Sequence, residues 1–480
     1  MECRVFDIKA FRFAFVIASI VSLKATSQQT DNLNTLLVIN KYDWTVNLDF
    51  DNSLLKATCK VEVTNSANRN VKKLTFVLYR LLTVRGVKSG ETPLSFEQSI
   101  RSFEDQERLQ SNFITVELEK PLQPKQSITL EIVYDGTLYG YTEVGWNYVR
   151  DRIDPNFTIL RPDCMAYPEL GYPANKINKQ FPKPNFDYRI KIAVPDTLVA
   201  VNGGTLVTAN TANGHATFEF KNIKKAWRMD VAISTYGKLS DNGLTVYYFK
   251  RDSTGAKKLL QALQNTTRLY TTWWGPVNNF TGFSIIEIPD GYGSQADVTS
   301  ILQTASAFKD STEVHQAYHE LSHLWNVDLK APSPRWEEGL ATFIEYLTIE
   351  KLEHREYLDY VTNWFLQVVK REVERDPRLR TVPMVDFGKN GMTDYSYSLG
   401  MIAFRILYEI VEEEAFNQSV KTFYQQYANK EATTEDFARV TKLASGRDLS
   451  AFFNDWFFTT DYVQLLERQS TFNELVIHYK

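Results

Sequence analysis

Residues 319–341 read HELSHLWNVDLKAPSPRWEEGLA, and this stretch determines how the second half of the chain is organised. His319 and His323 are spaced i and i+4, so on a helix both imidazoles lie on one face, one turn apart. Such a pair can reach a single zinc ion with bonds of about 2.0 to 2.1 Å, and Glu320 projects beside the metal. Glu320 is then free to take a proton from a zinc-activated water molecule. The motif therefore predicts a helix that carries a catalytic site with one zinc ion per chain.

A catalytic zinc ion needs a third protein ligand besides these two histidines, together with an open position. We expect a second helix to follow, with Ser333 as its N-cap and Pro334 as its first residue. This helix carries Glu337, Glu338 and, about two turns further on, Glu345. The residue types alone leave open which of these carboxylates is the third ligand.

The composition of the chain is that of a folded globular protein. Of its 480 residues, 43% are hydrophobic and 23% are charged, which excludes a disordered chain, a collagen-like repeat and a polytopic membrane protein. The 54 Lys and Arg residues against 58 Asp and Glu residues give a net charge of −4. Nucleic-acid-binding proteins use a broad basic surface to displace phosphate counterions. The charge balance therefore argues against nucleic acid as a partner.

The N-terminus has the pattern of an export signal. A basic region between Arg4 and Arg12 precedes the apolar run FAFVIASIVSL at residues 13–23, which is too short to span a bilayer of about 30 Å as a helix. The small residues within 25–27 suit a signal peptidase. We expect residues 1–27 to be a cleaved signal peptide, the mature chain to be periplasmic or extracellular, and no stable membrane insertion after cleavage. An uncleaved anchor is the alternative.

Hydrophobic residues alternate with polar residues from about Asn40 to Tyr236. Tyr42, Trp44 and Val46 begin this pattern, which recurs in later runs and predicts half-buried strands separated by turns. Beyond a turn-rich segment the period becomes helical, with one clear strand at Phe283 to Ile288. We therefore expect an α+β multidomain chain. Its parts are an N-terminal antiparallel β-sandwich-like domain (36–240), a mostly α-helical catalytic domain with a small sheet (241–465) and a C-terminal tail (466–480).

Two cysteines remain after the leader. Cys59 lies on the apolar face of an alternating run, which favours a buried thiol. One disulfide with Cys164 is possible in an oxidising compartment, but a scaffold of several disulfides is excluded.

Two segments of the chain resemble the paired motifs of the gluzincin zinc aminopeptidases of the alanyl-aminopeptidase and leukotriene-A-hydrolase type. They are His-Glu-Leu-Ser-His-Leu-Trp at 319–325 and Trp-Glu-Glu-Gly-Leu-Ala at 336–341. By this resemblance Glu338 is the third zinc ligand and Glu337 is its exposed neighbour. The loop at 324–337 between the motif histidines and this glutamate is shorter than is usual in the family.

The resemblance also implies residues around the metal. A later helix begins with Tyr397-Ser-Leu-Gly, similar to the Tyr-x-Lys-Gly motif whose tyrosine stabilises the oxyanion in this family, with Leu399 in place of the lysine. Tyr397 is therefore the candidate, and Tyr395 is its competitor. Thr342 and Glu345 match positions that would orient the zinc-binding histidines.

The resemblance covers nearly the whole mature chain. It implies a β domain followed by a thermolysin-like catalytic domain. The similarity ends near Trp456, so we expect a short form without the C-terminal helical-repeat domain that many members carry.

The chain departs from the family where the substrate binds. Family members have a Gly-x-Met-Glu-Asn segment whose Glu holds the free α-amine of the substrate, and Ala296 stands at that position here. The loss of this carboxylate removes a charge-assisted hydrogen bond, unless Asp297, Glu313 or Glu338 replaces it. The candidate substrate-binding residues of this segment are Gly293, Ser294, Gln295 and Asp297.

Three functions follow from these observations. The first is an exported zinc metallopeptidase that acts on peptide substrates, most simply as an aminopeptidase, with the edge of the strand at Phe283 to Ile288 pairing with the peptide. The second is a zinc endopeptidase, or an enzyme resembling the glycyl aminopeptidases, because the amine anchor is missing and the run His-Leu-Trp-Asn-Val is similar to that group. The third is a catalytically silent peptide-binding scaffold, against which the complete set of ligands and base argues.

Overall fold

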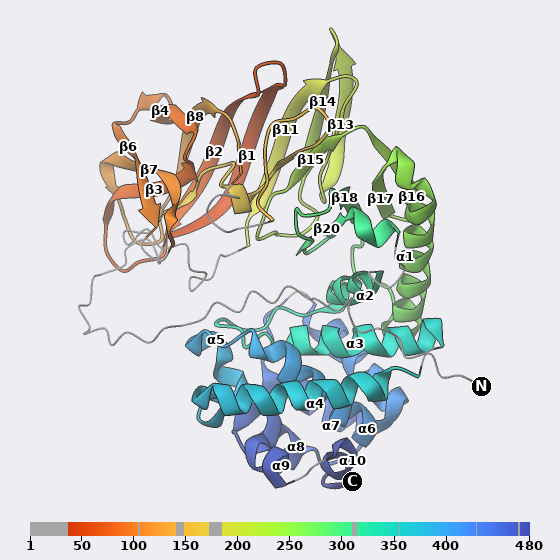
Figure 1. Ribbon diagram of the computed structural model, residues 1–480. Helices are drawn as coiled ribbons and strands as arrows, with labels where there is room; N and C mark the ends of the chain where they lie inside the picture. Colours follow the sequence, from red (N-terminus) through yellow and green to blue (C-terminus); the bar gives the residue numbers. More distant parts are fainter. Residues whose placement is uncertain are drawn as a thin grey trace. The chain divides into compact units, whose positions relative to one another are not determined.

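The computed structural model describes residues 37–103, 106–140, 148–171, 185–309, 314–354, 356–428, 430–468 and 471–480. Residues 33–480 form one compact unit. The expected signal peptide, residues 1–27, lies outside the described residues. Figure 1 shows strands in the first half of this unit and mostly helices in the second, as the change of hydrophobic period predicts.

An eight-stranded sheet dominates the N-terminal half, with strand order β13-β14-β11-β1-β2-β8-β4-β5. Tyr42, Trp44 and Val46 of β1 are almost fully buried, as their alternation predicts. The pairing between β1 and β11 is parallel, whereas the other pairs of this sheet are antiparallel. Its strands are β1 (Leu37–Asp49), β2 (Leu54–Asn65), β4 (Leu82–Ser89), β5 (Thr92–Pro93), β8 (Ser127–Gly136), β11 (Asp187–Pro195), β13 (Thr205–Ala212) and β14 (His215–Lys221).

Two smaller sheets complete this half. One has the order β10-β3-β7-β6 and the other β12-β15-β9. Their strands are β3 (Val71–Tyr79), β6 (Phe96–Phe103), β7 (Gln106–Leu122), β9 (Thr158–Leu160), β10 (Glu169–Leu170), β12 (Val199–Val201) and β15 (Val231–Ser234). Cys59 and Cys164 lie in the shared apolar core as free, buried thiols.

A five-stranded sheet, ordered β16-β17-β18-β20-β19, leads into the helical half. Its strands are β16 (Tyr236–Asp241), β17 (Leu244–Phe249), β18 (Phe283–Ile288), β19 (Gln295–Asp297) and β20 (Ser300–Thr304). The expectation that the edge of β18 pairs with peptide is wrong, because β18 is the central strand and pairs in parallel with β17 and β20. Every residue of β18 is buried, which is typical of a central parallel strand. The edge strand nearest to it along the chain is β19.

The helices pack around one apolar core that also includes residues of this sheet. They are α1 (Ser253–Trp274), α2 (His315–Ser322), α3 (Trp336–Glu353), α4 (Leu358–Arg375), α5 (Phe387–Asn390), α6 (Tyr395–Tyr427), α7 (Thr434–Ser445), α8 (Ser450–Phe453), α9 (Tyr462–Arg468) and α10 (Phe472–Ile477). Gly339 of α3 and Gly400 of α6 let these two helices approach closely, because a Cβ atom on Gly339 would lie 2.5 Å from the Cα atom of Gly400.

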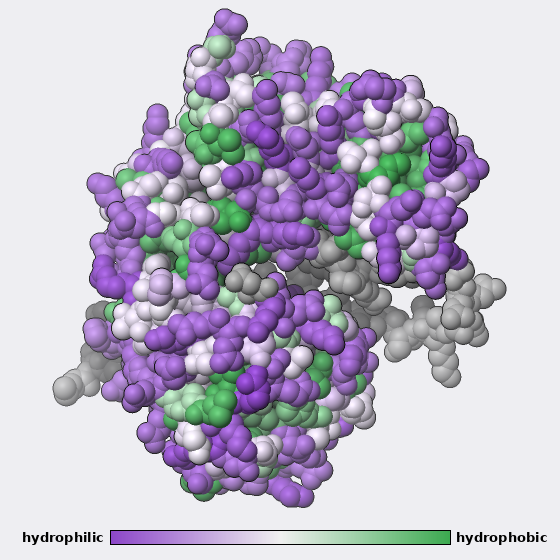
Figure 2. All heavy atoms as spheres, turned by 180° about the vertical axis from the view of Figure 1, so that it is seen from behind, coloured by the Kyte–Doolittle hydropathy of each residue, from purple (hydrophilic) through white to green (hydrophobic). Residues whose placement is uncertain are grey.

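The domain division expected at 240/241 falls inside the hairpin of β16 and β17, whose residues Asp241 and Leu244 are paired. The division into two domains at this point stays a prediction. Within the described residues, the helices are all too short or too polar to cross a membrane. The face of the molecule in Figure 2 is mostly hydrophilic, with small separate hydrophobic patches.

Candidate metal centre and active site

The first two predicted metal ligands lie at the end of α2. His319 is within α2, and His323 begins a single 3₁₀ turn (His323–Trp325) that continues the helix. Leu321 and Trp325 anchor this segment in the core, so the histidines occupy a different side of the helix. The two imidazole rings are 4.9 Å apart between centroids.

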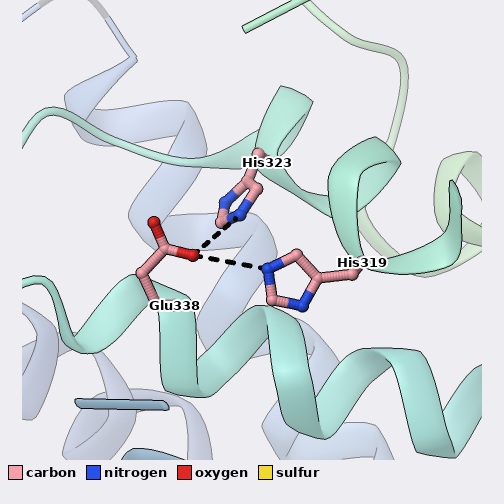
Figure 3. Close-up of side chains that lie close together, drawn as sticks. All are labelled: His319, His323 and Glu338. Atoms are coloured by element: carbon pink, nitrogen blue, oxygen red, sulfur yellow. Dashed lines mark hydrogen bonds and ion pairs between the residues drawn. The ribbon is translucent and has the colours of Figure 1, made fainter. Parts of the chain in front are cut away.

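Glu338, in the first turn of α3, completes a three-residue cluster with His319 and His323, as Figure 3 shows. Its Oε2 atom lies 3.3 Å from Nε2 of His319 and 3.3 Å from Nε2 of His323. Tetrahedral zinc with bonds of about 2.0 to 2.1 Å places its ligand atoms about 3.3 Å apart. The donor set and its spacing therefore fit zinc.

The start of α3 differs from the prediction. The helix begins at Trp336 with Arg335 as its N-cap, two residues later than Ser333 and Pro334 suggested. Ser333 instead accepts a hydrogen bond from the backbone N–H of Arg335, and Arg335 has a left-handed backbone with φ of 57°. Its guanidinium binds Oε1 of Glu338. One oxygen of Glu338 is thus held by arginine, and the other faces the histidines.

Outer contacts orient the imidazoles. Glu345 lies 3.6 Å from Nδ1 of His319, and the side-chain amide of Asn326 lies 2.5 Å from Nδ1 of His323. Thr342 does not share this role, because its hydroxyl donates to the backbone carbonyl of Glu338. With both Nδ1 atoms engaged, each Nε2 atom is left to face the metal position.

Carboxylates around His319 favour positive charge there. Burial disfavours its charged form, but the hydrogen bonds to Glu338 and Glu345 outweigh burial and raise the pKa of His319 to about 10. A divalent cation bound at this position would supply the positive charge that these carboxylates favour. His315, one turn earlier on α2, is not part of the cluster, since its Nε2 lies 2.8 Å from Glu353.

Glu320 projects from α2 beside the cluster. Burial raises the pKa of its carboxyl group, and His319, His323 and Glu338 all act on it electrostatically. Glu337 is half-buried, which corrects the expectation that it is exposed. It lines a small cavity together with Trp325 and Trp336, and burial raises its pKa to about 7.

Tyr397 and Tyr395, the two candidate oxyanion donors, have separate environments. The ring of Tyr397 lies parallel to that of His319, with centroids 6.2 Å apart and planes inclined by 12°. Burial and the nearby Glu338 carboxylate raise the pKa of the Tyr397 hydroxyl, so it stays protonated and can donate. The hydroxyl of Tyr395 instead donates to Asp376 at 2.9 Å. The geometry therefore favours Tyr397.

The predicted substrate-binding segment forms the edge strand β19 and the turn before it. Gly293 has φ of +70°, a conformation that favours glycine. The hydroxyl of Ser294 accepts a hydrogen bond from Gln303 of β20. Gln295 accepts a hydrogen bond from Arg228, and the Asp297 carboxyl lies near Arg228 and Asp230, where burial raises its pKa to about 7.

The strand register places Ala296 on the opposite face of the sheet from Gln295 and Asp297. Ala296 pairs with Ile301, which packs in the same core as Ala317 and Leu321 of α2. Side chains of directly paired residues lie on the same face of a sheet, so Ala296 lies on the side of the sheet where the core shared with α2 packs. Asp297 faces the other way and does not replace the missing carboxylate there.

Glu338 and Glu313 are the other two candidates to replace the missing carboxylate. Glu338 is occupied by the two histidines and Arg335. Glu313 lies outside the described residues.

Sequence reasoning missed Arg335, Asn326 and Arg228. The first was detectable, because Arg335 and Glu338 have the i, i+3 spacing of helical ion pairs. Asn326 depends on the 3₁₀ turn after α2, and Arg228 on a contact between segments 67 residues apart. Neither leaves a local signal in the sequence.

Part of this chain is similar to a known protein family. Residues 297–456 match the model of the Peptidase family M1 domain. Aminopeptidase M1-D of Oryza sativa subsp. japonica is 22% identical over 309 residues, which are 57% of this chain and 34% of that protein. The chain thus spans about a third of the length of this curated relative.

The fold is that of M1 zinc metallopeptidases. A mutant of the M1 zinc metallopeptidase from Deinococcus radiodurans, bound to a Tyr-Ser-Ala substrate, superposes with a TM-score of 0.58 at 16% identity, over 88% of this chain and 94% of that chain. A two-domain M1 zinc metallopeptidase bound to L-tryptophan gives a TM-score of 0.57 at 16% identity, with coverage of 88% and 94%. The expected fold class, a β-sheet part followed by a helical catalytic part, is confirmed.

Proposed function

Because this chain contains a Peptidase family M1 domain on the fold of M1 zinc metallopeptidases, we propose that it is a zinc-dependent metallopeptidase of the aminopeptidase type. One observation carries the proposal. The Nε2 atoms of His319 and His323 each lie 3.3 Å from the same oxygen of Glu338, which is the spacing that tetrahedral zinc requires.

His319, His323 and Glu338 would hold the zinc ion. A zinc ion bound there would polarise the scissile carbonyl group and acidify a water molecule. Glu345 and Asn326 keep the imidazoles oriented by contacting their Nδ1 atoms. Arg335 keeps Glu338 in place through its other oxygen.

In this scheme Glu320 transfers a proton and Tyr397 donates a hydrogen bond. The Glu320 carboxylate accepts a proton from the attacking water and then delivers it to the leaving amine. The Tyr397 hydroxyl donates a hydrogen bond to the oxyanion that develops on the substrate carbonyl. Both side chains lie around Glu338, from the separate helices α2 and α6.

The substrate is a peptide that lies along β19. An edge strand offers unpaired main-chain groups on one side, and an extended peptide can add to it as a further strand. A tripeptide, Tyr-Ser-Ala, is bound to the similarly folded Deinococcus radiodurans mutant.

A second candidate is an endopeptidase, or an enzyme of glycyl-aminopeptidase type. The observation that favours it is Ala296, which has only a methyl group on the α2 side of the sheet and offers no charge to a substrate ammonium. Of these two, the endopeptidase would accept peptides without a free N-terminus.

Peptide digestion separates these functions. The purified protein is incubated with peptides in matched free and N-acetylated forms, with and without a chelator, and the products are identified by mass spectrometry. Chelator-sensitive release of single residues from free peptides supports an aminopeptidase, and internal cleavage or cleavage of acetylated peptides supports an endopeptidase. Stoichiometric zinc without any hydrolysis would contradict both and favour a silent scaffold.

The Glu320→Gln variant tests the proposed base. The amide keeps the shape of the side chain but cannot accept the proton, so we expect turnover to fall by about 10²- to 10⁴-fold with zinc content unchanged. Metal analysis and kcat measure the two effects. Glu435→Gln, the same change at an exposed position on α7, is the control. Wild-type turnover in Glu320→Gln would refute the assignment.

We also propose that the mature protein is exported, on the strength of the basic and apolar pattern of the N-terminal segment. N-terminal sequencing of protein recovered outside the cytoplasm should begin near residue 28. Recovery with residues 1–27 still attached would contradict cleavage.

A further inference from the structure

Two arginines in the N-terminal half are buried despite their charge. Arg161 is 0% exposed and Arg228 is 1% exposed. Taking a guanidinium out of water costs several kcal/mol unless ion pairs and hydrogen bonds replace the lost hydration. The groups that bind Arg161 and Arg228 therefore determine what these two side chains hold in place.

Each arginine first pairs with a carboxylate of its own half. The Nε and Nη2 atoms of Arg161 donate to Asp151 at 2.7 to 3.2 Å. The same atoms of Arg228 donate to Asp230 at 2.5 and 2.8 Å, and Nη2 also donates to Asp163 at 2.6 Å. Bidentate pairs of this kind fix the plane of the guanidinium and so the direction of the remaining Nη1 group.

The Nη1 groups both point to the predicted substrate-binding segment. Nη1 of Arg161 donates to the backbone carbonyl of Tyr292 at 3.0 Å. Nη1 of Arg228 donates to the side-chain oxygen of Gln295 at 2.9 Å. The two acceptors flank the turn at Gly293, and Gln295 is the first residue of β19, so the turn is held on both sides.

Apart from the two arginines, the hydroxyl of Tyr292 donates to the backbone carbonyl of Arg150 at 3.2 Å, and the hydroxyl of Ser294 accepts a hydrogen bond from Gln303 at 3.2 Å. Strand β19 has three residues and pairs only with β20 among the described strands. The turn before it contains Gly291 and Gly293, both with positive φ, and glycine allows many alternative backbone conformations. A short edge strand after such a turn keeps one position only if other contacts fix it.

We propose that Arg161 and Arg228 form an arginine clamp that positions β19 to receive the peptide substrate. The clamp fixes the side of β19 that faces away from the core shared with α2, through Gln295, and so sets where the main chain and Ala296 lie relative to the metal-bearing helix. Arg161 and Arg228 are positioning residues, since neither contacts the metal cluster. The inference rests on the proposed peptidase function. Substrate binding then depends on Arg161 and Arg228 of the N-terminal half.

The Gln295→Met variant tests the clamp without disturbing the buried ion pairs. Methionine has a similar volume but a far weaker acceptor, so Nη1 of Arg228 loses its hold on β19. We expect KM for a peptide to rise at least about fivefold while kcat stays within about twofold and zinc content is unchanged. Gln295→Glu keeps an acceptor for Arg228 and should restore most of the affinity. Gln418→Met, at an exposed position on α6, is the matched control.

Hydrogen exchange gives a readout that does not depend on activity. In Gln295→Met, and in Arg228→Met where it folds, the amides of residues 292–297 should exchange faster while those of α2 and α3 keep their rates. Unchanged exchange at 292–297 together with an unchanged KM would overturn the clamp. If the wild-type protein hydrolyses no peptide, the proposed function fails, and the exchange rates alone still decide whether the clamp exists.

Discussion

At the scale of single residues, the site depends on where each hydroxyl and carboxylate is directed. Tyr395 and Tyr397 are two residues apart on α6, yet the first binds Asp376 and the second lies beside His319 and Glu338. On a helix, residues at i and i+2 do not share a face. Sequence proximity alone could not separate the two tyrosines, but helical geometry places them in different environments.

The Tyr397→Phe variant should therefore lose activity while Tyr395→Phe should not. Removal of one oxyanion donor costs about 10²- to 10³-fold in kcat, which we expect for Tyr397→Phe with zinc content unchanged. Tyr395→Phe loses one hydrogen bond and about 1 kcal/mol of stability. Steady-state kinetics and thermal unfolding measure the two. The reverse pattern, with Tyr395→Phe the inactive variant, would exchange the assignments.

Ala296 offers a gain-of-function test at the same scale. A glutamate at this position would lie on the α2 side of the sheet and could pair with the ammonium of a free peptide. We expect Ala296→Glu to raise the ratio of kcat/KM for free over N-acetylated peptides at least about tenfold. Ala296→Gln, of equal size and without charge, should leave this ratio close to that of the wild type. Equal ratios in all three proteins would show that position 296 does not contact the N-terminus of the substrate.

At the scale of elements, the crossing of α3 and α6 sets the distance between Glu338 and Tyr397. Gly339 follows Glu338 directly, and Gly400 lies one turn after Tyr397, so the glycine contact and these two side chains belong to the same crossing. Side chains at the crossing would separate the helices and the two functional groups with them.

Gly400→Ala tests this dependence. Its Cβ atom would lie 2.9 Å from the Cα atom of Gly339, closer than packed carbon atoms allow. We expect a loss of about 1 to 3 kcal/mol in stability and a fall in kcat, measured by denaturant unfolding and kinetics. Gly86→Ala, where the new Cβ atom meets nothing within 4 Å, should change neither. Wild-type kcat in a destabilised Gly400→Ala protein would show that catalysis does not depend on the close packing of α3 and α6.

The sequence predicted elements best where one local pattern determined them. The alternation at Tyr42, Trp44 and Val46 gave a strand, and the i, i+4 histidines gave the metal helix. The place of β18 in its sheet could not be read in this way, because strand order depends on partners that are distant in sequence. The late start of α3 depends on the left-handed backbone at Arg335, for which a non-glycine residue gives no signal.

At the scale of the whole molecule, a buried carboxyl group links stability to pH. Glu287 on β18 is 0% exposed, and its Oε2 atom accepts a hydrogen bond from the backbone N–H of Phe249 at 2.6 Å. Burial and the adjacent Asp252 raise its pKa to about 8, from 4.5 for an ordinary glutamate. Between these two pH values the folded protein holds a proton that the unfolded chain releases.

Stability should therefore decrease as the pH rises from 4.5 toward 8, through this group alone. Glu287→Gln keeps a neutral side chain at every pH, so it should unfold at a higher temperature than the wild type at pH 8 and show a smaller difference at pH 5. Thermal unfolding across this range measures the effect. If the unfolding temperatures of the two proteins changed in parallel across this pH range, Glu287 would not titrate there in the folded state.

The parallel pairing of β1 with β11 has a consequence for biosynthesis. Strand β1 occupies the middle of the eight-stranded sheet, and residues 50–186 separate it from β11. In a growing chain, one side of β1 therefore stays unpaired until β11 has left the ribosome. Contacts of such long range slow folding, which lengthens the time during which this side of β1 can pair with a wrong strand.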